Sequence, residues 1–412
     1  MSDTTASQYQ YQKAIIIKGD QEIDVSGVIG ELILVENIKS IGISGKVLIV
    51  DNANLFASSQ FTGTEILEIE VINHIQGKNI KKRFIMYETA SVTVVNDTTM
   101  TYVFSLMTEH VFRSHLQVIS KAYEGTPERI IKRVLDGELG VSLDTTLMNI
   151  DPVQRSLSIV TPYITPVVTL NWVLNGLTTN KGFPYFLFAS VKSDDVFMTS
   201  LEDILEAEPL FNRPFVKSSA IAASADPNKN LFTIENIEYS SRNDTLVNIA
   251  SGSVGAKYDV LDTVFGNRIS KPEFKITEML PDTKLIDTKF EVGGKKITEY
   301  ESNFIFGITA PSTIRMDGYG YDEEVDNLKS KIRRKSVISA MGNNTAVMTV
   351  TGTLFMQLDT PTVGGKIELE VTAMEGEETV LDDQKSGEFI ISSIRHTFFD
   401  EKHTVTLGVS KL

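Results

Sequence analysis

The sequence has 412 residues, a formal net charge of −15 and no cysteine. This length allows about two to four domains, and 42% hydrophobic with 23% charged residues excludes a disordered chain. The missing cysteines exclude disulfides, thiolate chemistry and Cys-ligated metals, and the acidic balance argues against wrapping of nucleic acid. No apolar run approaches the roughly 18 residues of a membrane helix. The polar N-terminus lacks the layout of a signal peptide and is predicted to be a flexible arm over residues 1–12.

The first hundred residues have the pattern of a series of strands. Apolar and β-branched segments recur at short intervals, and turn residues such as Gly63 and Asn96-Asp97 separate them. Several short strands with such turns favour an antiparallel sandwich or barrel. The predicted strands are Glu31–Ile38, Lys46–Val50, Glu65–Ile72, Arg83–Val95 and Thr101–Met107.

From about Arg113 the pattern changes to mixed helix and strand. Thr126 and Pro127 are typical of a helix N-terminus, and Ser200 followed by Asp203 is a variant of the capping box. These signals predict a mixed α/β region in the middle of the chain. Its predicted elements include helices starting after Thr126 and Ser200, helices at Pro166–Leu177 and Asp322–Met341, and a strand at Phe183–Val191.

After Met341 strands return in an order that repeats the N-terminal region. "LEIEV" (Leu67–Val71) matches "IELEV" (Ile367–Val371), and "FIMYETASVTVV" from Phe84 matches "FIISSIRHTFF" from Phe389. Chance similarity of alternating strands is the alternative, but four matches in one order favour a duplicated barrel-like unit with the α/β region inserted between and partly inside the copies. The other matches are "KVLIV" after Gly45 with "TLFMQL" after Gly352, "NDTTMTYVFSLM" with "DEKHTVTLGVSKL", and an echo of "VENIKS" in "IENIEYS".

The two faces of the repeated strands suggest different roles. The strands "LEIEV" and "IELEV" place aliphatic residues on one face and glutamates on the other, namely Glu68, Glu70, Glu368 and Glu370. "VLIV" and "LFM" are apolar on both faces, so both faces should be covered, within the domain or by another subunit. The candidate subunit-interface residues on these predicted strands are Val47, Ile49, Leu354 and Met356.

Motifs for catalysis or ligand binding are scarce. His110 and His115 have the wrong spacing for a helical metal pair, and His396 and His403 flank a predicted hairpin as cross-strand neighbours. "GSVGAK" from Gly252 lacks the spacing of a phosphate loop and is interpreted as a junction. We therefore assign no catalytic, cofactor-binding or metal-binding residue. Adjacent acids, which a glycosidase would need to converge in a cleft, occur at Glu202/Asp203, Glu323/Glu324 and Asp382/Asp383.

Segments spread along most of the chain match one known family in order. They are "ELILVENIKSIGISGKVLIVDNANLF", "TPERIIKRVL", "LNWVLNGLTTNKGFPYFLF", "GYDEEVDNLKSKI" and the closing "GTLFMQL…GGKIELEV…GEFIISSIRHTFF…HTVTLGV". With these segments the chain resembles the baseplate central hub proteins of contractile-tailed, T-even-like bacteriophages. The resemblance implies a homotrimer with two tube-like β-barrel domains per chain, which forms a pseudo-sixfold ring.

In that family the hub adapts threefold to sixfold symmetry. The resemblance implies a tail tube protein above, a trimeric spike below, other baseplate proteins around the middle domain, and a central conduit for DNA. It implies no enzymatic activity, cofactor, specific nucleic-acid binding or membrane insertion, and a place in the virion after assembly in the host cytoplasm. Because the last predicted strand ends close to Leu412, the spike is expected to be a separate protein. The four strand glutamates would line the lumen and repel DNA phosphates, or else face outward.

The predicted fold class is α+β and mainly β, with two related tube-like antiparallel barrels and an inserted α/β region. The predicted domains are residues 13–112 for the first barrel, 113–230 with 256–344 for the middle domain, and 231–255 with 345–412 for the second barrel. One competing function is a tail-associated cell-wall hydrolase that uses acidic residues of the middle domain as acid and base. A carbohydrate-binding β-protein is the other alternative.

Overall fold

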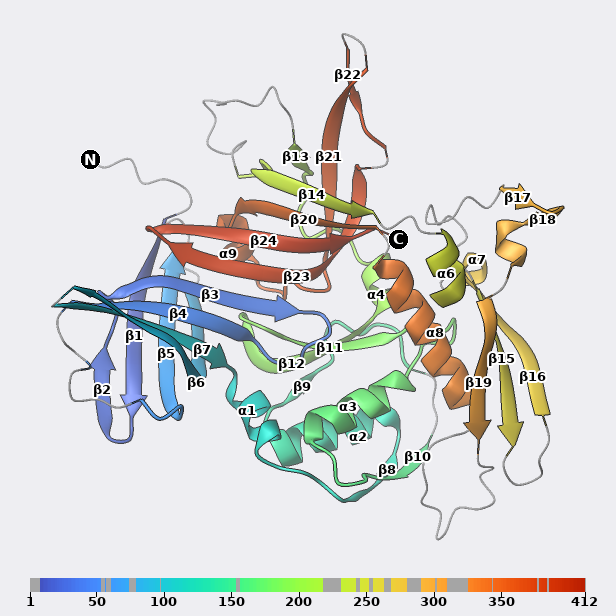
Figure 1. Ribbon diagram of the computed structural model, residues 1–412, viewed down its shortest axis with the longest axis horizontal. Coiled ribbons are helices and arrows are strands. Elements are labelled where there is room, and N and C mark those ends of the chain that lie inside the picture. Colours follow the sequence, from blue (N-terminus) through green and yellow to red (C-terminus); the bar gives the residue numbers. More distant parts are fainter. Residues whose placement is uncertain are drawn as a thin grey trace.

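The structure is a computed structural model. It describes residues 8–52, 56, 61–73, 79–96, 98–152, 156–217, 231–241, 245–251, 255–262, 268–279, 290–300, 302–309, 325–342, 344–375, 378–383 and 385–411. Most of these residues belong to strands, and the largest sheet contains 14 strands. Figure 1 shows their arrangement. No helix in the described ranges is long and apolar enough to span a membrane.

The first barrel is built from antiparallel strands in the order β3-β4-β7-β6-β5-β1-β2. Alternation places Leu67, Ile69 and Val71 of β5 in the core and the glutamates between them on the other face, as expected from the sequence. The bounds are β1 (Tyr9–Lys18), β2 (Gln21–Asp24), β3 (Ile29–Asn37), β4 (Ser44–Asp51), β5 (Glu65–Asn73), β6 (Asn79–Asn96) and β7 (Thr99–Met107).

The start of β1 corrects the predicted flexible arm. Residues 9–12 lie in this strand, where Tyr9 pairs with Asn73 of β5. The ring of Tyr9 packs edge-on against those of Tyr11 and Phe398, with centroids 5.3 and 5.0 Å apart. The prediction failed because the segment is mostly polar, although Tyr9 and Tyr11 lie on the same face of a strand, where their rings can pack.

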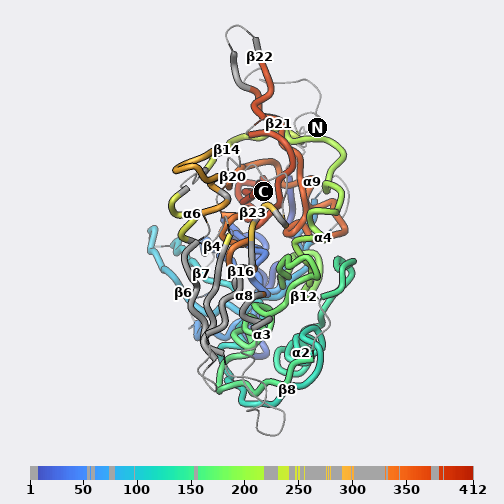
Figure 2. The backbone as a smooth tube through the Cα atoms, turned by 90° about the vertical axis from the view of Figure 1, so that its right-hand side faces the viewer, coloured from blue at the N-terminus to red at the C-terminus, as the bar shows by residue number. Residues whose placement is uncertain are grey.

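The second barrel contains β14 (Asn236–Ser241), β20 (Asn344–Thr351), α9 (Thr353–Gln357), β21 (Lys366–Glu375), β22 (Glu378–Leu381), β23 (Gly387–Phe399) and β24 (Lys402–Ser410). Its strands follow the order β14-β20-β24-β23-β21, with β13 (Phe215–Lys217) added in parallel to β21. The short strand β13 comes from the segment that the sequence assigned to the middle domain. The hairpin of β21 and β22 projects beyond the rest of the molecule (Figure 2).

The strand orders of the two barrels are equivalent, which confirms two related barrels in one chain. β14, β20, β24, β23 and β21 take the places of β3, β4, β7, β6 and β5. Leu67 and Ile367 are opposite Phe84 and Phe389 in their respective strand pairs, as the sequence comparison expected. Both long strands also have an irregularity at the same point, after Met86 and after Ile391.

Two of the sequence matches are wrong in detail. Lys46–Val50 pairs with β7, and Val347–Thr351 pairs with the corresponding residues of β24. Lys46–Val50 is therefore equivalent to Val347–Thr351 and not to the segment after Gly352. Thr353–Gln357 forms the helix α9, whose first four side chains are all buried. A short apolar run buried on every side cannot be distinguished by periodicity from a strand. The echo of "VENIKS" in "IENIEYS" is also out of register, because Val35 corresponds to Ser240.

Much of the middle region lies below the second barrel and beside the first, and it has its own hydrophobic cluster around Ile130, Leu170 and Tyr185 (Figure 1). At Ser200 and Asp203 both halves of the predicted capping box are formed. The helices are α1 (Glu109–His115), α2 (Pro127–Val134) with a π-turn at Leu135–Leu139, α3 (Pro166–Asn175), α4 (Leu201–Glu206), α6 (Thr245–Ser251), α7 (Ile276–Met279), a 3₁₀ turn at Ile297–Glu299, and α8 (Val325–Met341). The strands are β8 (Ala122–Gly125), β9 (Leu143–Asp144), β10 (Leu157–Val160), β11 (Tyr185–Ser190), β12 (Ser193–Ser200), β15 (Gly255–Asp262), β16 (Arg268–Lys275), β17 (Glu291–Val292), β18 (Lys295–Lys296) and β19 (Ser302–Thr309).

Candidate functional site: the seam between the barrels

The two barrels meet at an antiparallel strand pair that we call the seam, formed by residues 31–37 of β3 and 393–399 of β23. Phe399 lies opposite Glu31 at one end and Ser393 opposite Asn37 at the other. Phe398 is part of the second barrel in sequence, but its fully buried ring belongs to the core of the first. Backbone pairing and a shared core therefore join the barrels into one continuous sheet (Figure 1).

A buried polar cluster crosses the seam. His396 Nε2 lies 3.2 Å from Glu36 Oε1, and His396 Nδ1 lies 3.1 Å from His403 Nε2. All three side chains are at most 1% exposed. The His403 ring stacks on Phe398 with centroids 4.3 Å apart. Glu36 Oε2 and His403 Nδ1 are buried without a hydrogen-bond partner, so the two contacts that do form favour the register in which β3, β23 and β24 meet, because losing them would leave still more buried polar groups unpaired.

Acid is expected to weaken this seam. Burial first, and then the nearby His396 and Lys192, hold the pKa of His403 well below its usual 6.5. The folded chain therefore keeps His403 neutral, whereas the unfolded chain binds a proton as the pH falls through 6.5. Stability should be complete above that pH and decrease below it, by up to about 1.4 kcal/mol per pH unit for one proton.

Urea unfolding between about pH 7.5 and 5.5 checks this prediction. His403→Phe keeps a ring that can stack on Phe398 and removes the titrating group, so its stability should depend less on pH than that of the natural chain. His115→Gln, at an exposed position of α1, is the control and should keep the full dependence. Equal pH dependence in the natural chain and in His403→Phe would contradict the assignment.

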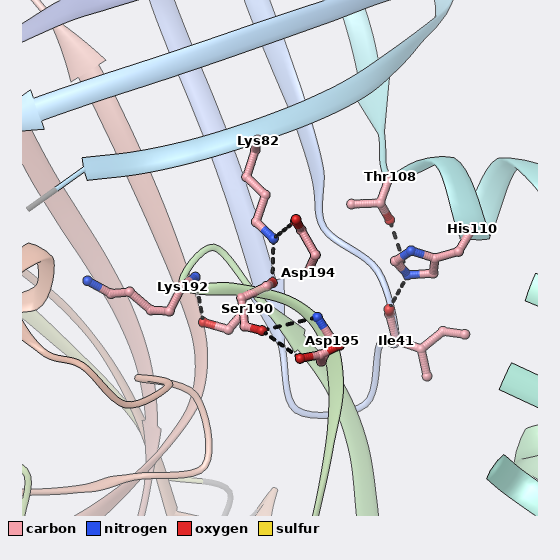
Figure 3. Close-up of polar contacts among 9 residues, drawn as sticks. Ile41, Lys82, Thr108, His110, Ser190, Lys192, Asp194 and Asp195 are labelled. Carbon is pink, nitrogen blue, oxygen red and sulfur yellow. Dashed lines mark hydrogen bonds and ion pairs between the residues drawn. The ribbon is translucent and has the colours of Figure 1, made fainter. Parts of the chain in front are cut away.

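A second polar site joins the first barrel to the middle region (Figure 3). Lys82 of β6 is only 5% exposed; its Nζ donates to Asp194 Oδ1 at 2.7 Å and also to the Ser193 carbonyl. His110 of α1 contacts the Ile41 carbonyl with Nε2 at 2.6 Å. These groups border a pocket of about 390 Å³, lined by Ile43, Lys81, Lys82, Arg83, Thr108, Glu109, His110, Arg113, Leu139, Gly140, Val141, Ala189, Ser193 and Asp194.

The polar groups around this pocket pair with one another and connect β6 and α1 to neighbouring segments. Burial lowers the pKa of His110, so its imidazole is neutral and can donate to the Ile41 carbonyl. Asp194 balances the charge of Lys82, and Glu109 balances Arg113 at 3.0 Å. Within the described ranges, no group of three or more His, Cys, Asp or Glu side chains could hold a metal ion. The residues lining the pocket therefore make contacts that hold β6 against the start of β12.

Sequence reasoning did not identify Glu36 or Lys82, although a signal was present. Glu36 alternates in phase with the buried Leu32 and Leu34, and Lys82 with the buried Ile80 and Phe84. A charged residue in phase with an apolar face must find a partner when it is buried. Charged residues of this kind indicate where strands meet another part of the chain.

The predicted interface residues lie inside the single chain. Val47 and Ile49 have no exposed surface and belong to the core of the first barrel. Leu354 and Met356 are buried on the helix α9, with 8% and 2% exposure. Intrachain packing accounts for all four side chains, which leaves none of them free for a second subunit in this conformation.

The four predicted lumen glutamates lie on β5 and β21, on the faces turned away from the barrel cores. Glu68 is partly neutralised, since Lys13 Nζ lies 2.6 Å and Arg83 Nε 3.9 Å from its carboxylate. Glu70 accepts a hydrogen bond from Asn79 at 2.7 Å. Glu368 is exposed, and Glu370 is half-buried beside it. Their place relative to a channel stays a prediction.

Three of the acids considered for hydrolysis make structural contacts. Asp203 accepts hydrogen bonds from Ser200 and from the amides of Asn149 and Ile150, and it caps α4. Its neighbour Glu202 pairs with Lys181 at 2.6 Å. Asp382 forms an ion pair with Lys385 at 2.7 Å, and the pair Glu323/Glu324 lies outside the described residues.

Comparison with known proteins relates this architecture to tail proteins. No family model matches the sequence, and no curated protein matches it significantly. The tail protein from Neisseria meningitidis MC58 aligns at 10% identity and a TM-score of 0.56, covering 98% of this chain and 97% of that one. The 43 kDa tail protein of prophage MuSo2 from Shewanella oneidensis aligns at 10% identity and a TM-score of 0.55, covering 97% of both chains.

A larger assembly contains the same fold. A chain of the lidded Francisella PdpA–VgrG complex aligns at 11% identity with a TM-score of 0.50. The alignment covers all of this chain and 53% of that one. The chain thus shares, along nearly its whole length, the fold of tail proteins that include one from a prophage, and at the level of the fold this confirms the resemblance expected from the sequence.

Proposed function

We propose that this protein is a structural hub of a contractile phage tail baseplate, a homotrimer that adapts threefold to sixfold symmetry. The observation that carries this proposal is the repeated strand order of the two barrels. Three chains with two equivalent barrels each present six similar units around one axis. Such a ring suits a hexameric tail tube on one side and a trimeric spike on the other.

The seam supports this role because it holds the two barrels of one chain in a fixed relation. A linker would allow them to rotate independently, whereas a continuous sheet with the buried Phe398 and His396 transmits load between them. Other baseplate proteins would contact the middle region from outside. The protein would act in the virion, after assembly in the host cytoplasm.

The proposed ring encloses a conduit for DNA. The net charge of −15 disfavours adhesion of phosphates to its wall. Of the four strand glutamates, Glu368 and Glu370 are better placed to repel DNA than Glu68, which Lys13 and Arg83 partly neutralise. Passage of DNA without specific binding is the expected behaviour.

Mass measurement by light scattering tests the proposal. The particle formed by the chain, alone or mixed with the tube and spike proteins of the same phage, should contain three copies of the 45.7 kDa chain. Images of the assembled ring should show six similar lobes with threefold symmetry. A chain that stays monomeric in all mixtures and cleaves cell walls would instead support the hydrolase alternative.

A further inference from the structure

Two strand edges at equivalent places in the repeat lack a partner in the described part of the chain. One edge of β23 is shared, with β21 pairing near its start and β3 along residues 393–399. β6 pairs with β5 in the same way up to Met86, but Tyr87–Asn96 pairs only with β7. At the far end of the sheet β14 pairs only with β20, whereas its equivalent β3 has a partner on both edges.

The free edge of β6 carries exposed apolar residues. Val92 and Val94 are 53% and 65% exposed. Their equivalents in the second barrel, His396 and Phe398, are buried at the seam, as the shared register with β7 and β24 shows. Exposed apolar strand edges favour association with another strand.

The edge strand β14 shows the complementary pattern. Its residues Ile237 and Tyr239 are half-buried against the core of the second barrel. The equivalent residues of β3, Leu32 and Leu34, are fully buried under the paired strand β23. The second barrel is therefore open at the position where the seam closes the first.

We propose that Tyr87–Asn96 of β6 pairs antiparallel with β14 of a second copy of this chain, so that the contact between chains repeats the seam. When each seam residue is replaced by its equivalent in the other barrel, the expected opposite pairs are Val92 with Tyr239, Thr93 with Glu238 and Val94 with Ile237. Both apolar pairs favour this register, and no like charges oppose each other in it. Val94 would complete the core of the neighbouring second barrel, as Phe398 completes that of the first.

Each chain has one edge of each kind, so the contact is head-to-tail and can close into a ring. Closure at three chains rests on the proposed hub function, whereas the contact itself follows from the repeat. Every barrel in such a ring would have the same neighbours on both sides.

Disulfide trapping tests the register, because the chain has no cysteine of its own. In an antiparallel strand pair, opposite residues alternate between hydrogen-bonded and non-hydrogen-bonded pairs. The Ile38 amide donates to the Ser392 carbonyl, so these two residues are a hydrogen-bonded pair, and Ile33 and Thr397, five positions along, are a non-hydrogen-bonded pair. The Cα atoms of such a pair are about 4.5 Å apart. Thr93 and Glu238 are the equivalent pair between chains, and both are exposed.

Chains with Thr93→Cys mixed with chains with Glu238→Cys should give a covalent two-chain product on mild oxidation. A chain carrying both changes should give a covalent three-chain product on a non-reducing gel. The control is a mixture of Thr93→Cys chains with Leu116→Cys chains, because Leu116 is 71% exposed and can form a disulfide only by random collision. This mixture should give little covalent product. Equal yield in the control mixture would overturn the register.

A non-covalent variant distinguishes the contact from the hub function. Val94→Asp should raise the dissociation constant of the assembly at least about tenfold. At a dilution where neither protein assembles, its melting temperature should equal that of the natural chain, because the side chain is exposed in the single chain. Val160→Asp, at a 40% exposed strand position of the middle region, is the matched control and should assemble normally. If Val94→Asp still forms trimers and the cysteine pair gives no specific cross-link, this contact is wrong, but the proposed hub function is unaffected. If the natural chain neither assembles nor cross-links, both proposals are wrong.

Discussion

Phe398→Ala is expected to cost about 3–5 kcal/mol of unfolding free energy, the usual loss for truncating a buried phenylalanine. The ring is fully buried in the core of the first barrel, although its strand belongs to the second. It also stacks on His403 and contacts Tyr9, with centroids 4.3 and 5.0 Å away. The cavity would open at the seam, so both barrels should become less stable.

The adjacent Phe399→Ala is the matched control. Its side chain is 56% exposed on the opposite face of the same strand, so the change should stay within about 0.5 kcal/mol. Urea unfolding of both variants, followed by circular dichroism, gives the comparison. Similar losses in the two variants would show that the seam does not depend on core packing by Phe398.

Gly45→Ala is expected to destabilise the first barrel by about 2 kcal/mol or more, in the range of overpacking in a dense core. A Cβ at Gly45 would lie 2.3 Å from the Ile33 carbonyl oxygen and 3.0 Å from Leu34 Cδ2. The obstacle is backbone of the paired strand β3, which cannot rotate away as a side chain could. The shift would spread to the seam, because β3 also pairs with β23.

Gly137→Ala controls for the general effect of replacing glycine. No atom lies within 4 Å of a Cβ at Gly137, which sits in the π-turn after α2. Its stability should stay the same or rise slightly, since alanine reduces the freedom of the unfolded chain. If thermal melting shows no difference between the two variants, the close approach at Gly45 does not limit packing.

Local patterns in the sequence predicted many elements of this fold. Alternation identified β5 and its duplicate β21, and the pair Ser200 and Asp203 identified the start of α4. The same reasoning took the segment after Gly352 for a strand, because an apolar run has no period that distinguishes a strand from a buried helical turn. It also treated Tyr9 as part of a polar arm, since its partners Asn73 and Phe398 are far away in the sequence.

By itself, the sequence determined which residues alternate in each strand and that one β-unit occurs twice, because both are properties of short segments. Only the tertiary structure decided which strands share an edge, that Phe398 of one barrel fills the core of the other, and that Glu36 meets His396 across the seam. The physical reason is that strand pairing satisfies backbone groups identically for many partners. The choice among partners therefore depends on long-range packing, which periodicity along the chain does not record.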